Sequence, residues 1–177
     1  AMRLKLPDVT LVMLDCTCPE LARLALLDTL ELIEPAETLT ISNNTFLHVQ
    51  GSRLIHVPPW QTIQAYCEFL WYTLPNFIHT KCFLNIQWDG WVTSPDMLDD
   101  AYLDYDYIGA PWWYNDGLNV GNGTGIRSVK LMQFLGQHRD FLPVQGKEDE
   151  LLSRVYRPVL ERHGFKVQTC IEHSSRQ

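Results

Sequence analysis

Asp89 is the leading candidate for a functional side chain in this 177-residue chain, because it lies at the end of a strongly apolar run. Residues 83–86 have the composition of a buried strand, and residues 87–90 read Gln-Trp-Asp-Gly. Ligands of open α/β sheets bind beyond the carboxyl ends of the strands, where this carboxylate would lie. Its oxygens suit a divalent cation that carries substrate phosphates. The alternative interpretation is an Asp-Gly turn between two strands.

Tryptophan is the second type of residue that points to a ligand. An indole ring can stack on the apolar face of a sugar while its N–H donates to a hydroxyl, which suits carbohydrate recognition. Burial in the core is the more common role of any single tryptophan. Four of the six tryptophans lie in the two segments that would flank a cleft beside Asp89: Trp88, Trp91, Trp112 and Trp113.

A glycine-rich stretch over residues 120–128 precedes a predicted helix over residues 128–135. Glycines permit positive φ and a close approach of the backbone to a ligand, and a helix N-terminus favours an anion. A turn that leads into a helix is the simpler interpretation of the glycines alone.

The elements that would position these residues alternate along the chain. Apolar runs predict strands over residues 9–14 and 38–41, the first ending at Asp15 and the second at Ser42-Asn43. Apolar residues at helical spacing predict the helices, proline and glycine mark where helices begin or end, and short apolar segments predict the remaining strands. We therefore expect an α/β domain with a mixed, largely parallel sheet and helices on both faces. The other predicted elements are helices over residues 20–33, 61–72, 95–104 and 147–162 and strands over residues 105–113 and 165–169.

Composition limits the possible partners and the compartment. The chain is 46% apolar, which is ordinary for a soluble domain, and we expect one domain over residues 1–177. A net charge of −7 without a Lys/Arg run argues against nucleic acid as a partner. No apolar stretch is long enough for a transmembrane segment, and no signal peptide is recognisable. The five cysteines lack Cys-x-x-Cys spacing, so we expect free thiols and a cytoplasmic protein.

Four motifs in this order resemble the signature of a family of bacterial glycosyltransferase-like domains of GT-A type. The resemblance extends from about Val9 to Cys170 and implies a fold that binds a nucleotide sugar. The motifs are Gln-Trp-Asp-Gly at residues 87–90, Tyr-Asp-Tyr-Ile-Gly-Ala-Pro-Trp at residues 105–112, Gly-Asn-Gly at residues 121–123 and Glu-Asp at residues 148–149.

On the donor side, the resemblance puts Asp89 where this fold keeps a metal-binding Asp-x-Asp motif, with Gln87 in place of the first acid. One carboxylate can hold Mn²⁺ or Mg²⁺ when a diphosphate supplies further oxygens, and activity without a metal is the alternative. His173 is a candidate for a further metal ligand. Asp15 and Ser42-Asn43 end the first two strands, where the fold usually holds the nucleobase and ribose.

On the acceptor side, Gly121, Asn122 and Gly123 resemble the glycine loop of the fold, with Trp112 and Trp113 beside them. The remaining motif resembles an acidic pair at a helix start, from which inverting transferases take a general base for the acceptor hydroxyl. We assign the base to Asp149 and keep Glu148 as the second choice. Acids in a first turn also complement the helix dipole, which is the structural alternative.

The expected activity is transfer of a sugar from a nucleotide-diphosphate donor to an acceptor hydroxyl, with inversion at the anomeric carbon. A neighbouring domain or a second copy of the chain could complete the acceptor side. A nucleotidyltransferase is one alternative, but residues 15–19 read Asp-Cys-Thr-Cys-Pro and not a lysine- and glycine-rich phosphate loop. A catalytically silent carbohydrate-binding domain is the other, and it would not need the acidic pair.

Overall fold

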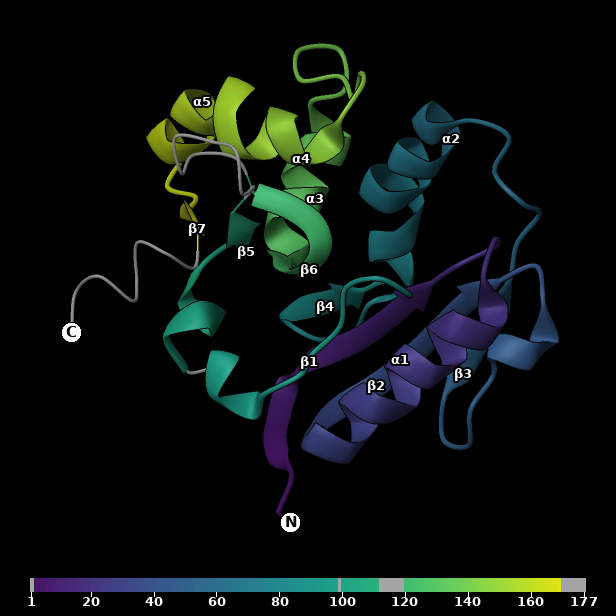
Figure 1. The fold of residues 1–177 in the computed structure, drawn as a ribbon. Helices are drawn as coiled ribbons and strands as arrows, with labels where there is room; N and C mark the ends of the chain where they lie inside the picture. Colours follow the sequence, from purple (N-terminus) through teal and green to yellow (C-terminus); the bar gives the residue numbers. More distant parts are fainter. Residues whose placement is uncertain (1, 99, 112–119, 170–177) are drawn as a thin grey trace.

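The computed structural model describes residues 2–98, 100–111 and 120–169 of the chain. Within these ranges, seven strands form one sheet in the order β3-β2-β1-β4-β6-β5-β7 (Figure 1). β6 runs antiparallel to β4 and β5, and the other strand pairs are parallel. The predicted mixed, largely parallel α/β sheet is therefore confirmed. The strands are β1 (Leu4–Leu14), β2 (Ile33–Ser42), β3 (Arg53–His56), β4 (Cys82–Ile86), β5 (Tyr107–Pro111), β6 (Val120–Ser128) and β7 (Val167–Thr169).

Helices cover both faces of the sheet and create two separate apolar cores. On one face, α1 (Pro19–Leu32) packs Ala22 and Leu26 against the side chains of β1 and β4. The other face is covered by α2 (Ile63–Glu68), α3 (Val129–Gln137) and α5 (Arg157–Arg162). Figure 1 shows α1 in front of β1 and β2, with α2 to α5 above the sheet. This second face also holds α4 (Glu148–Glu150), where the predicted acidic pair begins.

The first two strands are longer than predicted, because each begins before its apolar run, in a segment that contains a proline. In β1 the pairing register with β2 shifts between Leu6 and Thr10, which accommodates Pro7. In β2, Pro35 lies in the half that pairs with β1, before the pairing with β3 begins at Leu39. Proline is tolerated at irregular or open strand edges, where its missing N–H costs no ladder hydrogen bond.

The long predicted helices are divided into short turns. Residues 61–72 form α2 and a π-helical turn, Phe69–Thr73, and a 3₁₀ turn, Leu74–Phe77, continues past the expected break at Pro75. Proline fits there because the first turn of a helix leaves its N–H groups unpaired. The predicted helix over residues 147–162 consists of α4, a π-helical turn, Leu151–Val155, and α5. Residues 95–104 contain two 3₁₀ turns, Pro95–Met97 and Asp100–Asp104, in place of one helix.

The glycine-rich stretch is a strand and not a loop, which corrects the sequence prediction for Gly121, Asn122 and Gly123. β6 lies between β4 and β5 and pairs with both. Gly125 shows one reason for glycine here, because a Cβ at this position would lie 3.1 Å from the carbonyl oxygen of Ile108 in β5. The predicted helix does follow, and its N-cap is Ser128, whose hydroxyl accepts the N–H of Leu131.

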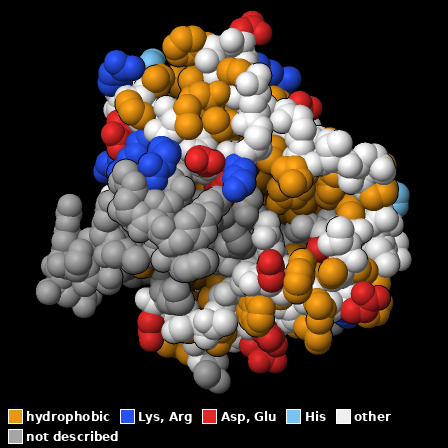
Figure 2. Space-filling model, turned by 45° about the horizontal axis from the view of Figure 1, so that its top comes forward, with side chains coloured by type: hydrophobic (Ala, Val, Ile, Leu, Met, Phe, Trp, Pro, Cys, Tyr) orange, Lys and Arg blue, Asp and Glu red, His pale blue; other side chains and the backbone are white. Residues whose placement is uncertain are grey.

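The surface carries both signs of charge. Figure 2 shows Lys and Arg side chains mainly over the upper part of one face and Asp and Glu side chains over both parts. Among the residues described, no helix combines the length and the apolar character that crossing a membrane requires. The four cysteines in these ranges, Cys16, Cys18, Cys67 and Cys82, are free thiols, as predicted.

Candidate active site

A cavity of about 420 Å³ lies at the carboxyl ends of β1 and β4. It brings together three of the predicted donor-binding residues, Asp15, Gln87 and Asp89, which are up to 74 positions apart in the chain. Two aspartates but no lysine, arginine or histidine are found among its described lining residues. Of the other predicted donor residues, Ser42 is buried with its hydroxyl bonded to the N–H of Asn44, and Asn43 is exposed outside this cavity.

The sequence leaves open whether Asp89 belongs to a turn or to a ligand site, and the structure places it in a turn that also lines the cavity. Residues 87–90 form a turn, in which Gln87 and Gly90 exchange backbone hydrogen bonds of 2.7 and 3.2 Å. The turn projects over the cavity, so that Asp89 is exposed and also lines it. The side-chain amide of Gln87 donates to the hydroxyl of Tyr66 at 3.4 Å, which ties the turn to α2. A turn position and a ligand position are therefore compatible here.

Asp15 has a structural task at the entrance to α1. Its Oδ1 accepts the backbone N–H groups of Thr17 at 2.9 Å and Cys18 at 2.7 Å. Its Oδ2 accepts the hydroxyl of Thr17 at 3.3 Å. The carboxylate thus orders the loop that leads into the helix, as Asp side chains often do in turns. Its contact with a donor stays a prediction.

The tryptophans separate into two places. Trp88 is 40% exposed and lines the large cavity, whereas Trp91 lines a second, apolar cavity of about 200 Å³ beside β5 and β6. Trp112 and Trp113 lie outside the described residues, as does His173. Sequence reasoning missed Trp60, which lines the large cavity and packs against the rings of Tyr66 and Phe69. The proline pair before it and the helix start after it could have drawn attention to it.

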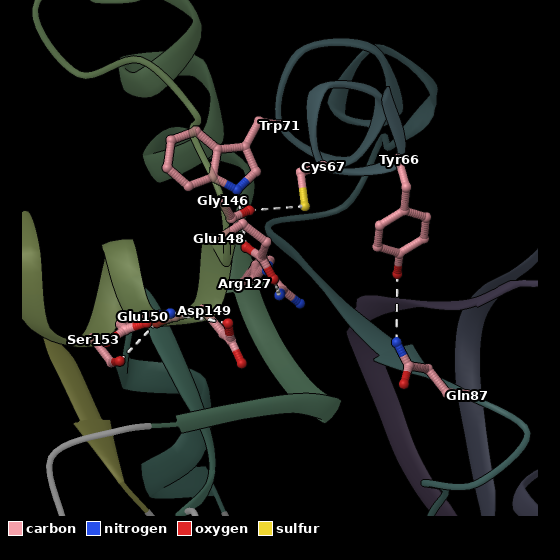
Figure 3. A network of polar contacts seen from close by, with 10 residues as sticks. All are labelled: Tyr66, Cys67, Trp71, Gln87, Arg127, Gly146, Glu148, Asp149, Glu150 and Ser153. Carbon is pink, nitrogen blue, oxygen red and sulfur yellow. Dashed lines mark hydrogen bonds and ion pairs between the residues drawn. The ribbon is translucent and has the colours of Figure 1, made fainter. Parts of the chain in front are cut away.

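Glu148, the second candidate for the base, is buried and held on both sides. One oxygen forms a 2.5 Å ion pair with Nη2 of Arg127, and the other accepts the indole N–H of Trp71 at 2.9 Å (Figure 3). Burial lowers the pKa of Arg127, but the charge of Glu148, its hydrogen bond to Arg127 and the nearby Tyr107 and Tyr66 together raise the pKa above its usual value, so the guanidinium remains charged. Both carboxylate oxygens of Glu148 thus have partners within the protein.

Asp149 differs from its neighbour in its surroundings. It is 5% exposed, and its Oδ1 accepts the N–H of Glu150 at 3.0 Å. Burial raises the pKa of the Asp149 carboxyl, and the negative charge of Glu148 raises it further. A carboxylate with a raised pKa is a better proton acceptor than an exposed aspartate.

α2 connects the cavity to the acidic pair. Tyr66 faces the cavity, and the pKa of its hydroxyl is raised to about 12 by burial and by the charge of Glu148. Two other residues of α2 contact the segment before the acidic pair. The thiol of Cys67 donates to the carbonyl of Gly146 at 3.7 Å, and the side-chain amide of Gln64 donates to the carbonyl of Val144 at 2.7 Å. Figure 3 shows Tyr66 directed toward Gln87 and Cys67 directed toward Gly146. The described lining of the cavity includes neither Glu148 nor Asp149, and α2 links the cavity to the segment that precedes this acidic pair.

A family comparison covers more than half of the chain. Residues 58–168 match DUF5672, which is described as a protein of unknown function. The chain belongs to the DUF5672 family. The matched segment contains α2, the turn with Asp89, the buried pair of Arg127 and Glu148, and Asp149. No curated protein matches the chain.

Solved structures of sugar and nucleotide transferases share the fold of this DUF5672 member. A mannosyltransferase from Pyrobaculum calidifontis, in complex with GDP-Man and Mn²⁺, has a TM-score of 0.64 at 10% identity, with 94% of this chain and 56% of that chain covered. Glucosyl-3-phosphoglycerate synthase from Mycobacterium tuberculosis, with Mn²⁺, UDP and phosphoglyceric acid, has a TM-score of 0.57 at 13% identity, covering 92% and 68%. At these identities the likeness shows the fold alone.

A nucleotidyltransferase is also among the similar structures. The 2-C-methyl-D-erythritol 4-phosphate cytidylyltransferase from Thermus thermophilus has a TM-score of 0.56 at 12% identity, with 90% of this chain and 86% of that chain covered. This DUF5672 chain thus spans about half of the mannosyltransferase and most of the cytidylyltransferase. The GT-A-type fold is common to both kinds of enzyme.

A divalent cation would find few protein ligands in this DUF5672 site. Within the described ranges, no group of three His, Cys, Asp or Glu side chains could hold a metal ion. The cavity is nevertheless acidic, and Asp89 offers an exposed carboxylate at its edge. This set fits a cation that is shared with a diphosphate and keeps several waters, and not one bound by the protein alone.

Proposed function

We propose that this domain is a glycosyltransferase that moves a sugar from a nucleotide-diphosphate donor to an acceptor hydroxyl with inversion. The observation that carries the proposal is Asp149, a nearly buried carboxylate with a raised pKa. It follows the segment with Val144 and Gly146 that is hydrogen-bonded to α2, the helix whose Tyr66 lines the cavity at the sheet edge. The fold similarity to two sugar transferases supports it. A separate carbohydrate-binding module would not require such a base.

The residues divide into a base and a donor-binding group. Asp149 accepts the proton of the acceptor hydroxyl as its oxygen attacks the anomeric carbon from the face opposite the diphosphate. The bond from the anomeric carbon to the phosphate oxygen breaks, and the nucleoside diphosphate leaves. Trp60 and Trp88 offer aromatic faces for the base or the sugar, and Gln87 and Asp89 offer polar contacts. A cation at Asp89 would supply positive charge to the leaving diphosphate.

The nucleotidyltransferase alternative is weakened by Asp15. Transfer of a nucleotide requires recognition of a triphosphate, for which loop amides and lysines are the usual donors. Here the amides of Thr17 and Cys18 are already bonded to the Asp15 carboxylate, which would also repel a phosphate. The described lining of the cavity contributes no cation to offset it, which disfavours a triphosphate more than the less charged diphosphate of a nucleotide sugar.

The acceptor side would be completed from outside this chain. Because the chain covers 56% of the mannosyltransferase, we propose that a neighbouring domain or a second copy provides part of the acceptor site. The free thiols fit a cytoplasmic location for this activity.

Calorimetric titration with nucleoside diphosphates and nucleotide sugars, with and without Mn²⁺, tests the proposal. We expect one nucleotide family to bind, and transfer to a hydroxyl acceptor to follow. Incorporation of a nucleotide from CTP or another triphosphate would favour the nucleotidyltransferase. Binding of a free sugar without any nucleotide binding would favour a silent carbohydrate-binding domain.

A further inference from the structure

Glu148 lies beside the proposed base but has no oxygen left for an acceptor. We propose that Glu148 is a positioning residue, clamped between Arg127 and Trp71, which holds Asp149 in place and sets its charge environment. This inference rests on the proposed function of Asp149 and adds a separate role for its neighbour. Glu148, Arg127, Trp71 and Tyr107 are called the Glu148 clamp below.

The clamp joins three distant parts of the chain at one buried point. Arg127 comes from β6, Trp71 from the π-helical turn after α2, and Glu148 from α4. All three are at most 1% exposed. Arg127 lies opposite Phe83 of β4 and opposite Tyr107 of β5, and its guanidinium stands 5.1 Å from the centre of the Tyr107 ring. The start of α4 is therefore attached to the interior of the sheet (Figure 3).

Stability alone gives little reason for this arrangement. Transfer of two charges from water into a protein interior costs free energy that their attraction repays only when all polar atoms are satisfied. In the clamp, Nε and Nη1 of Arg127 and the hydroxyl of Tyr107 are buried without a hydrogen-bond partner. Apolar side chains of similar volume would fill this space at equal or lower free energy. We infer that the charges have a functional task.

The effect on Asp149 follows from the charges around it. After burial, Glu148 makes the largest contribution that raises the pKa of Asp149, and Arg127 acts in the opposite direction. The other titratable groups that face this region are Tyr107 of β5 and, from α2, Cys67 and Tyr66, and the pKa of about 12 keeps the Tyr66 hydroxyl uncharged near neutral pH. Burial raises the pKa of Tyr107 well above its usual value and that of Cys67 to about 11. Near neutral pH both are uncharged, so Glu148 and Arg127 control the basicity of Asp149.

Titration of Asp149 by NMR tests the clamp without any need for activity. The chain is labelled with ¹³C at the aspartate carboxyl carbons, and the Asp149 signal is identified by its absence in Asp149→Asn. We expect Glu148→Gln to lower the pKa of Asp149, since the adjacent negative charge is lost. Trp71→Phe is the matched control, because it removes one hydrogen bond to Glu148 and leaves the ion pair. It should move the pKa of Asp149 much less.

A double variant keeps the test valid if Glu148→Gln does not fold. Arg127→Met combined with Glu148→Met removes both charges at similar volume, and buried pairs replaced in this way often fold well. The pKa of Asp149 should again fall, but by less, because the opposing charge of Arg127 is also gone. An unchanged pKa of Asp149 in the variants that fold would overturn the inference.

Activity measurements then separate this inference from the proposed function. If the wild type transfers sugar, the acid limb of its pH–rate profile should move to lower pH in Glu148→Gln and stay in place in Trp71→Phe. A wild type without transferase activity, but with the expected NMR shifts, would contradict the proposed function and leave the clamp intact. A normal acid limb in an active Glu148→Gln would contradict the clamp alone.

Discussion

The cavity at the sheet edge and the Glu148 clamp differ in how far their charged side chains are exposed to solvent. Asp89 stands exposed at the tip of a turn that is closed by its own backbone. Glu148 and Arg127 are withdrawn from solvent and depend on each other. An exposed carboxylate can therefore be altered with little consequence for folding, whereas a change to either clamp charge affects the whole domain.

In the proposed mechanism, this difference separates ligand binding at the cavity from proton transfer at Asp149. The cavity is built from turns and loops, where side chains can adapt to a ligand. Asp149 lies on α4, which the ion pair between Glu148 and Arg127 fixes to β6, so we expect its position to be set before an acceptor binds. The comparison predicts large stability effects in the clamp, large rate effects at Asp149 and mainly affinity effects in the cavity.

The largest expected effect comes from breaking the buried ion pair. Arg127→Met leaves Glu148 buried without its cation, and removal of one partner of such a pair typically lowers the free energy of unfolding by about 3–5 kcal/mol. Urea denaturation measures the loss. Addition of Glu148→Met should recover most of it. A single variant as stable as the wild type would show that the clamp charges are solvated.

Asp149→Asn should reduce the rate while the fold persists. Loss of a general base lowers turnover by about 10²–10⁴-fold, which a transfer assay with a competent acceptor would detect. Donor affinity should be retained, and Glu148→Gln should be milder. Wild-type turnover in Asp149→Asn would remove Asp149 from the mechanism.

The same substitution has a pH-dependent effect on stability. The raised pKa of Asp149 means that the folded protein favours the protonated carboxyl. This contribution to stability is present below the unfolded pKa of 3.8 and is lost as the pH rises through the folded pKa. At pH 7, Asp149→Asn should therefore melt at or above the wild-type temperature. As the pH falls toward 4, the melting temperature of the wild type should rise relative to that of the variant. A constant difference between pH 4 and 7 would contradict a raised pKa.

Asp89→Asn should weaken donor binding by roughly ten- to a hundredfold, the usual effect of losing a bond to a charged group. The melting temperature should stay nearly unchanged, because the side chain is exposed and asparagine suits the same turn. Calorimetry and thermal unfolding of the same preparation separate the two. A variant that melts many degrees lower would assign Asp89 to the turn alone.

The smallest effect is expected at Trp88. If its ring stacks on the donor, Trp88→Ala should weaken binding by roughly two- to tenfold, in line with about 0.5–1.5 kcal/mol for an aromatic contact. It should also abolish most of the fluorescence quenching by a nucleotide sugar. Trp91→Phe is the control, because Trp91 lines the other cavity and its loss should leave the quenching intact. Equal quenching in all three proteins would place the ligand elsewhere.

Local patterns predicted most of the elements in their order, but they missed β3 and gave a loop in place of β6. They also placed Asp89 after a strand and Asp149 near the start of a helix, as the structure has them. The strand before Asp89, the start of α3 after Ser128 and the end of α5 shortly before Gly164, where φ is 84°, depend on neighbours in the sequence. These features follow from side-chain alternation, capping and backbone freedom, which act over a few residues. The fold class could be predicted because strands and helices that alternate along a chain permit few layered arrangements.

Only the tertiary structure shows that both carboxylate oxygens of Glu148 have partners, which leaves Asp149 as the acid of the pair for the proposed proton transfer. Glu148 and Asp149 are adjacent acids at the start of α4, and in the sequence only the family resemblance favoured Asp149. The partners of Glu148 are 21 and 77 positions away in the chain, and they meet it only when β6 and the segment after α2 pack together. Burial and pairing with distant residues set the properties of a charged side chain, because they control its exposure to water and to other charges.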